Sequence, residues 1–300
     1  MKLYYYQDSV GNFGDDLNPW LWPQLLPGAF DRDDGVLFVG IGSLLSQKIP
    51  TPPLKVVFGT GVGAAGVGAG QLPSIDSRWR FGCVRGPLSA QALGLESKLA
   101  ITDSAALIRT IALPKESKCF DLSFMPHHKS ARSANWKLYC KLAGINYIDP
   151  SASVHETLQS IQRSKIVLAE AMHGAIVSDA LRVPWIPIRL YDHILEFKWQ
   201  DWCQSLGLAY KPVNLNSALS LEKTFSSRLR RKVDPFFVAM GLRKLIKNVE
   251  PTLSSDYAIE LATTRLQEEL ERLKADYFSE SLFPADWLTT SKNEQFFRLT

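Results

Sequence analysis

A histidine and a glycine stand side by side between an expected strand and an expected helix, and this pair is the first place to look for chemistry. His173 and Gly174 follow the apolar run 165–168 and begin the run 175–181, which favours a helix. Imidazole titrates near neutral pH and so suits general acid or base catalysis, and an adjacent glycine allows close approach of a substrate. Glu170 can orient the ring or bind a hydroxyl. The alternative is a structural histidine satisfied within the fold.

A cation stands at the end of another expected strand. Arg85 follows the strand expected at 79–84, and Pro87 suits the first turn of a helix. A guanidinium there can bind a carboxylate or a phosphate through paired hydrogen bonds, and we expect it to point toward the mouth of a cleft. The alternative is a surface arginine paired with an acid. Asp103 ends a further expected strand, where capping of the next helix is the preferred interpretation.

The first glycine-rich turn, at 11–16, opens an expected helix. It lacks the G-x-G-x-x-G pattern, so a dinucleotide fingerprint is not supported. Its two acids, Asp15 and Asp16, disfavour a phosphate bound directly against them. With Asn12 they are expected either to cap the helix or to accept hydrogen bonds from sugar hydroxyls.

Two more glycine turns, at 40–43 and 59–63, also follow expected strands. Ligands of open α/β folds bind at the carboxyl ends of the strands. Three such turns in one series therefore predict a rim that contacts a ligand. Gly42 and Ser43 are expected on the side of this rim where an acceptor with sugar hydroxyls would bind.

These residues are positioned by an alternation of strand and helix signals, which predicts parallel βαβ units. In the first series we expect strands, or strand-like apolar runs, at 2–6, 36–40, 55–61, 79–84 and 101–108, with helices at 15–26 and 86–95. In the second we expect strands at 119–128, 146–150 and 165–168, a strand that ends at 190, a last strand at 210–215, and helices at 132–143, 154–163, 175–181 and 198–207. Near-continuous apolar strands indicate sheets covered by helices on both faces.

Two such series predict two Rossmann-like lobes that face a cleft. We place the boundary near 113–118, which gives lobes at 1–115 and 116–215 and a helical extension at 216–300. Within the extension, 221–248 is basic with interleaved apolar residues, and 256–276 has the pattern of an amphipathic helix.

The composition of the chain argues against several classes of protein. The formal net charge is +4, which is far from the density of a nucleic-acid binder, and the hydrophobic fraction of 46% is that of a globular protein. The four cysteines are scattered without a C-x-x-C pair, so we expect no disulfide framework and no zinc site. We expect neither a signal peptide nor a membrane span, and a cytoplasmic location.

Taken together and in order, the motifs resemble those of the polysaccharide pyruvyl transferase family. The matching segments cover roughly residues 1–210 and are GNFGDDLN (11–18), GIGS (40–43), RGPLS (85–89), ITDSA (101–105), YIDP (147–150), AEAMHGAIVSDALRVPWI (169–186) and FKWQDWCQSLGL (197–208). The last of them resemble the ExoV-like branch of exopolysaccharide biosynthesis proteins.

This resemblance implies a GT-B-like fold and transfer of pyruvyl from phosphoenolpyruvate to two hydroxyls of a sugar, without a metal or other cofactor. Family members often carry Ser-x-Arg-Leu-His-Gly at the histidine. Here Ala171 and Met172 replace the arginine and the leucine. Because that arginine is expected to hold the donor anion, Arg189 or Lys198 is the hypothetical substitute.

The resulting hypothesis makes His173 the general base, assisted by Glu170, with Arg85 as catalytic cation. Gly174 joins Arg85 and His173 in binding the donor. The expected acceptor is a lipid-linked oligosaccharide, and 221–248 suits either a peripheral contact with anionic lipid or a helical layer packed on the lobes. A nucleotide-sugar glycosyltransferase of the same architecture and a catalytically silent scaffold remain as alternatives. The oligomeric state is left open.

Overall fold

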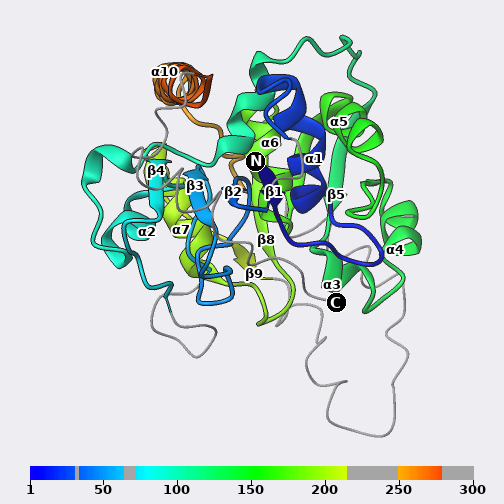
Figure 1. Cartoon of the computed structure of the whole chain (residues 1–300). Helices are drawn as coiled ribbons and strands as arrows, with labels where there is room; N and C mark the ends of the chain where they lie inside the picture. Colours follow the sequence, from blue (N-terminus) through cyan, green and yellow to red (C-terminus); the bar gives the residue numbers. More distant parts are fainter. Residues whose placement is uncertain (31–33, 64–71, 215–248, 279–300) are drawn as a thin grey trace, which may run out of the picture.

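The computed structural model describes residues 1–30, 34–63, 72–214 and 249–278. The expected peripheral segment at 221–248 lies outside these ranges. In the described part the chain is an α/β protein with two parallel sheets (Figure 1). The strand signals of the two series therefore led to the right class of fold.

The first sheet has the strand order β1-β2-β3-β4, and every pair in it is parallel. Its elements are β1 (Lys2–Tyr4), α1 (Phe13–Leu25), β2 (Val36–Val39), β3 (Leu54–Phe58), β4 (Trp79–Cys83) and α2 (Pro87–Ala92), followed by the 3-10 turns η1 (Ser97–Leu99) and η2 (Ser104–Thr110).

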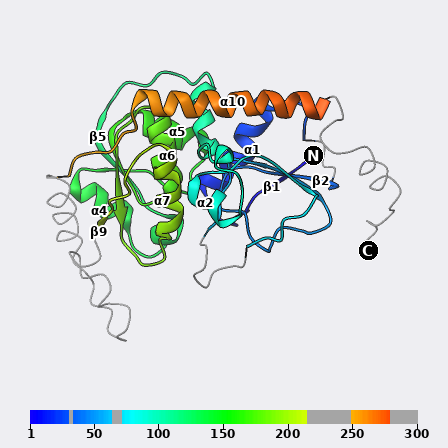
Figure 2. The same cartoon turned by 90° about the vertical axis from the view of Figure 1, so that its left-hand side faces the viewer.

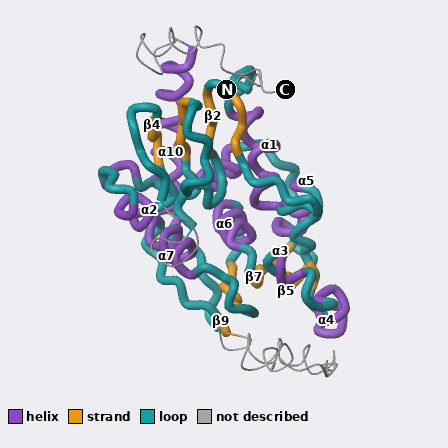
Figure 3. The backbone as a smooth tube through the Cα atoms, turned by 60° about the horizontal axis from the view of Figure 1, so that its bottom comes forward, coloured by secondary structure: helices purple, strands orange, loops and turns teal. Residues whose placement is uncertain are grey.

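The second sheet has the order β6-β5-β7-β8-β9 and is also parallel. Its elements are β5 (Phe120–Met125), α3 (His128–Ala131), α4 (Trp136–Ala143), β6 (Asn146–Tyr147), α5 (Val154–Gln162), β7 (Ser164–Ala169), α6 (Met172–Ala180), β8 (Trp185–Arg189), α7 (Glu196–Ser205) and β9 (Val213–Asn214). Figure 3 shows the two sets of strands with α6 between them.

One expected strand is absent. Residues 101–103 form no strand: the preceding Ala100 makes an isolated bridge with Val84, and η2 begins at Ser104. The side chain of Asp103 accepts a hydrogen bond from the backbone N–H of Ala105, which turns the chain at this point. Gly59 allows the close approach, because a Cβ atom there would clash with Ser104. The interpretation of Asp103 as a cap is confirmed, and its place at the end of a strand is wrong.

The two series share one core. The largest cluster of buried apolar side chains includes Leu17 and Phe38 from the first series and Met125, Ile176 and Trp185 from the second. Helix α6 packs against η2, and α7 packs against α2 of the first series. The sheets are thus joined by helices that cross between them, while the boundary at 113–118 stays a prediction.

Helix α10 (Asp256–Phe278) lies over elements of both series (Figure 2). It buries Ile259, Ala262, Leu266 and Leu270 at helical spacing, whereas Leu261 is 45% exposed. Leu261 lies two residues after Ile259, about 200° around the helix, and so faces away from the core.

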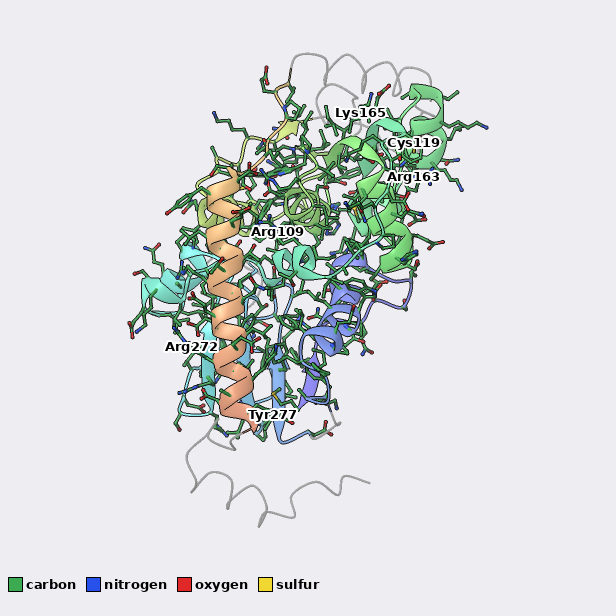
Figure 4. The ribbon with its side chains drawn as sticks, turned by 90° about the horizontal axis from the view of Figure 1, so that it is seen from above. Arg109, Cys119, Arg163, Lys165, Arg272 and Tyr277 are labelled. Carbon is green, nitrogen blue, oxygen red and sulfur yellow. The ribbon has the colours of Figure 1, made fainter. Side chains whose placement is uncertain are left out.

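Polar contacts fasten α10 at both ends. At its start, Arg182 of the second series lies 2.9 Å from Asp256 and donates to the carbonyl of Ser254 at 2.7 Å. At its end, the hydroxyl of Tyr277 donates to the carbonyl of Ala29 in the first series at 3.3 Å. Figure 4 shows the helix from above, with Arg109 beside it and Tyr277 at its C-terminal end.

Candidate functional site

A cavity of about 760 Å³ lies where the carboxyl ends of both sheets face each other. It is lined by residues 4–7, 12–15, 42–46, 48, 62–63, 125, 127–128, 171–173, 195 and 198. Each group of these residues follows a strand or begins a helix, as expected of a ligand site in a parallel α/β fold.

His173 lines this cavity from the first turn of α6, and its side chain is 15% exposed. The ring lies against the backbone of Gly14 in α1, so closely that a Cβ atom on Gly14 would clash with Nδ1. On its other side, Nε2 lies 3.7 Å from Oδ2 of Asp103. The histidine predicted to carry the chemistry therefore stands between the two series.

The start of α6 is itself a feature of the cavity wall. The N-cap residue, Ala171, provides no side-chain cap, and the first turn holds no acidic residue. The first N–H groups of a helix have no acceptor within it, and they carry the positive end of the helix dipole. Together these groups favour an anion beside Met172 and His173, both of which line the cavity.

Lys198 adds a cation to the same wall from α7. Burial, and after it the positive charge of Arg85, lower the pKa of Lys198 to about 8, while the charge of Asp15 acts in the opposite direction. Among the described residues, the Lys198 amine forms no hydrogen bond and no ion pair. A half-buried amine that lines a cavity and lacks a direct partner is suited to an anionic ligand.

Asp15 is the acidic residue of the cavity, and it is 9% exposed. Burial raises its pKa to about 6, against the opposing effects of the His173 charge and of a hydrogen bond from Asn12. That bond, from Nδ2 of Asn12 to Oδ2, is 2.6 Å long. Asp15 and Asn12 thus offer neighbouring hydrogen-bonding groups, as expected for hydroxyl recognition.

Arg85 is not where the sequence suggested. Its side chain is fully buried and is not among the residues that line the cavity. Nε donates to Asp201 at 3.0 Å, Nη1 donates to Oγ of Ser43 at 2.8 Å, and Nη2 donates to the carbonyl of Val62 at 2.6 Å. The guanidinium therefore lies behind Ser43 and Val62, which do line the cavity, and its expected direct contact with a donor stays a prediction that this placement does not favour.

Four other predicted residues, Glu170, Arg189, Gly174 and Asp16, also lie outside the lining. Glu170 is buried and accepts backbone hydrogen bonds from His127 and Leu190, each of 3.0 Å, so its carboxylate ties strand ends together instead of orienting His173. Burial raises the pKa of Glu170 to about 7, opposed by hydrogen bonds from Ser130 and the backbone.

Arg189 pairs with Glu196 at 2.6 Å and with Asp192 at 3.0 Å. Of the two hypothetical substitutes for the missing arginine, only Lys198 lines the cavity. Gly174 packs against Met125, and Asp16 accepts a hydrogen bond from the backbone of Asn12. The other acceptor-side residues expected from the sequence, Gly42 and Ser43, do line it.

Two histidines of the cavity were missed. His127 and His128 follow β5, and their rings lie 4.2 Å apart between centroids. Burial lowers both pKa values, that of His128 to about 4, so both rings are neutral at physiological pH and act as hydrogen-bonding groups. The signal was present, since two adjacent polar rings end an otherwise apolar strand.

Comparisons with known proteins show to which family the chain belongs. The model of the polysaccharide pyruvyl transferase family matches residues 48–193. The chain is 40% identical over 218 residues to the succinoglycan biosynthesis protein ExoV of Rhizobium meliloti (strain 1021), and the match covers 71% of this chain and 67% of that protein. The chain belongs to the polysaccharide pyruvyl transferase family. No solved structure matches it.

Membership in this family makes the chain a transferase and confirms the resemblance to the ExoV-like branch. The match to the family model includes His173, Arg85 and Asp103, whereas Asp15 and Lys198 lie outside its range. Among the described residues, no cluster of three or more His, Cys, Asp or Glu side chains is arranged to hold a metal ion. Within the same ranges, no helix combines the length and the apolar character needed to cross a bilayer.

Proposed function

We propose that the cavity transfers pyruvyl from phosphoenolpyruvate to two hydroxyls of a sugar in a surface polysaccharide precursor. The observation that supports this most is the coincidence, at one wall, of the uncapped start of α6, the amine of Lys198 and the ring of His173. Phosphoenolpyruvate carries a phosphate and a carboxylate, and these three groups suit such an anion.

The opposite wall suits the acceptor. Tyr4, Tyr5 and Tyr6 line it, and aromatic faces pack well against the apolar faces of sugar rings. Asn12 and Asp15 stand next to them with hydrogen-bonding groups for hydroxyls. In this proposal the first sheet supplies the acceptor side and the second sheet the donor side of a GT-B-like pair of lobes.

The reaction proceeds in two additions. Protonation of the donor's methylene carbon makes the adjacent carbon electrophilic, and a sugar hydroxyl adds there as its proton passes to a base. Inorganic phosphate leaves with the donor's C–O bond electrons, and a second hydroxyl closes the ketal as its proton passes to solvent, which balances the proton taken from solvent by the methylene carbon. His173 is the base, and such a group contributes about 10²–10⁴-fold to rate. The positive groups at the start of α6 and on Lys198 stabilise the charge of the departing phosphate.

The acceptor is a lipid-linked oligosaccharide in this proposal, which places the protein in the cytoplasm, at the inner face of the membrane where such precursors are built. The ExoV relative bears the name of a succinoglycan biosynthesis protein. The polysaccharide made with this chain is accordingly an acidic exopolysaccharide whose charge comes in part from the ketal carboxylate.

Thermal shift measurements test the donor before any acceptor is known. Phosphoenolpyruvate should raise Tm with concentration, inorganic phosphate should do so weakly, and UDP-glucose should have no effect. Stabilisation by UDP-glucose with no response to phosphoenolpyruvate would favour the glycosyltransferase instead. With succinoglycan oligosaccharides stripped of their ketals as acceptor, phosphate release should require both substrates and should vanish in His173→Ala.

A further inference from the structure

Two buried polar atoms face each other behind the cavity wall without a hydrogen bond. Nε2 of His173 and Oδ2 of Asp103 are 3.7 Å apart, and within the described residues neither atom has a hydrogen-bond partner. Buried polar groups are nearly always paired, so an unpaired donor and an unpaired acceptor at this separation require an explanation. The distance exceeds a hydrogen bond by less than 1 Å, which a small rotation of the imidazole closes.

Asp103 is held firmly on the other side. Its Oδ1 accepts from the backbone N–H of Ala105 at 3.0 Å, and its side chain has no exposure. The turn η2 that follows packs against α6, the helix that carries His173. One carboxylate oxygen is therefore used as a cap, while the second remains for the imidazole.

The other neighbours of the ring determine which nitrogen reaches the cavity. Gly14 lies against Nδ1, and Nε2 is buried toward Asp103. Asp15 of α1 interacts electrostatically with both His173 and Lys198 of α7, so the charged groups near the ring include Asp15 and Lys198 as well as Asp103. The first turn of α6 adds no acidic residue. Nε2 and not Nδ1 is among the fully buried polar atoms without a partner, so Nδ1 is the nitrogen left to meet a substrate in the cavity that His173 lines.

We infer that Asp103 is a positioning residue for His173, which rests on the proposed role of His173 as base. Asp103 accepts a hydrogen bond from Nε2–H and so selects the tautomer whose Nδ1 is unprotonated. When the sugar hydroxyl adds to the donor, its proton moves to Nδ1, and the carboxylate stabilises the imidazolium that forms. The proton then leaves with the departing phosphate, which restores the starting tautomer. Catalytic histidines elsewhere depend on carboxylates in this manner.

The tautomer can be measured without substrate. The chain has five histidines, so nitrogen shifts of protein labelled with ¹⁵N-histidine can be assigned with a His173→Gln sample. At mildly alkaline pH, we expect Nε2–H in the wild type. In Asp103→Asn the amide oxygen keeps the cap on Ala105, which turns the amide NH₂ toward Nε2 and reverses the tautomer. Identical His173 nitrogen shifts in wild type and Asp103→Asn would overturn the inference.

Activity measurements distinguish a role of Asp103 in positioning His173 from a role in stabilising the fold. Asp103→Asn keeps the cap, whereas Asp103→Ala loses it, so a merely structural aspartate predicts that Ala is the more damaging change. A positioning role predicts that both variants lower kcat by about 10²–10⁴-fold with little change in KM for phosphoenolpyruvate. Equal kcat in wild type and Asp103→Asn would contradict it. Full activity of His173→Ala would instead refute the proposed role of His173 as base. The tautomer measurement needs no substrate, so it would still test the contact between Asp103 and His173.

Discussion

The guanidinium of Arg85 and the carboxylate of Asp201 meet at 3.0 Å, 116 positions apart in the chain, with no exposure of either side chain. Asp201 also accepts from the backbone N–H of Ser89 at 2.9 Å and from its hydroxyl at 2.5 Å. Through this pair, α7 of the second series is fastened to the glycine turns of the first. The cavity wall that holds Lys198 is therefore positioned by Arg85 from behind.

Removal of one partner of this pair tests that role. Arg85→Met leaves the Asp201 charge buried without its cation, which should lower the free energy of unfolding by about 3–5 kcal/mol. Chemical denaturation measures the loss, and the double variant Arg85→Met with Asp201→Leu should recover part of it. A stable Arg85→Met protein that has lost phosphoenolpyruvate binding would instead make Arg85 a direct ligand of the donor.

A methyl group at Gly14 should displace the ring of His173, the proposed base. Gly14→Ala places a Cβ against Nδ1 of His173, and misplacement of a catalytic group by about 1 Å can cost on the order of 10²-fold in rate. Gly63→Ala is the matched control, because Gly63 also lines the cavity but a Cβ there has only an ordinary contact with Ser43. Initial rates of phosphate release compare them, and equal rates in both variants would show that the ring tolerates displacement.

The cation of the donor wall should be Lys198 and not Arg189. Lys198→Met should raise KM for phosphoenolpyruvate by about ten- to a hundredfold, the value of a charge-assisted hydrogen bond. Within the described part of the chain, Arg189→Met removes the ion pairs with Asp192 and Glu196 and no group that lines the cavity, so its KM should stay near that of the wild type. The reverse pattern would transfer the role to Arg189.

The same amine predicts a pH dependence. The pKa of Lys198 is lowered to about 8, so the cationic form that we propose to bind the donor is lost as pH rises through that value. KM for phosphoenolpyruvate should therefore rise above about pH 8 in the wild type. Lys198→Arg stays charged and should remove this rise. If KM rises equally in both proteins, the increase at alkaline pH is caused by the titration of another group.

Asp15 should lower stability at neutral pH. Its pKa is raised from 3.8 in the reference state to about 6, so the folded protein holds this proton more tightly than the unfolded chain does. Stability from this group is present at low pH and is lost as pH rises through about 6. Asp15→Asn should accordingly stabilise the fold by about 1–3 kcal/mol at neutral pH and have little effect below pH 4. Urea denaturation at both pH values checks the sign, and equal effects at the two would contradict it.

The strand and helix signals predicted most of the fold because they are local. β7, α6 and β8 occupy almost the ranges expected, since an apolar strand, a glycine junction and a helical run follow each other without ambiguity. Residues 101–108 failed because Ile101, Leu107 and Ile108 are apolar in either conformation. The turn depends on a cap at Asp103 and on contact with Gly59, which is distant in the chain.

The sequence predicted the cavity residues whose location depends on their position after a strand. It did not predict the location of a residue that depends on a hydrogen-bond partner distant in the chain. His173, Asn12, Asp15 and Ser43 all follow strands or begin helices, and they line the cavity. Arg85 also follows a strand, yet Asp201 holds it below the surface. No spacing rule relates residues so far apart, which is also why the approach of Asp103 to His173 escaped the sequence.

Helix α10 restricts how far the two sheets can move relative to each other. It is held to the second sheet's side through Arg182 and to the first through Tyr277, so a swing of one sheet away from the other would have to break one of these attachments. A helix attached at both ends in this way keeps the separation of the two sheets constant, and with it the width of the cavity between their carboxyl ends.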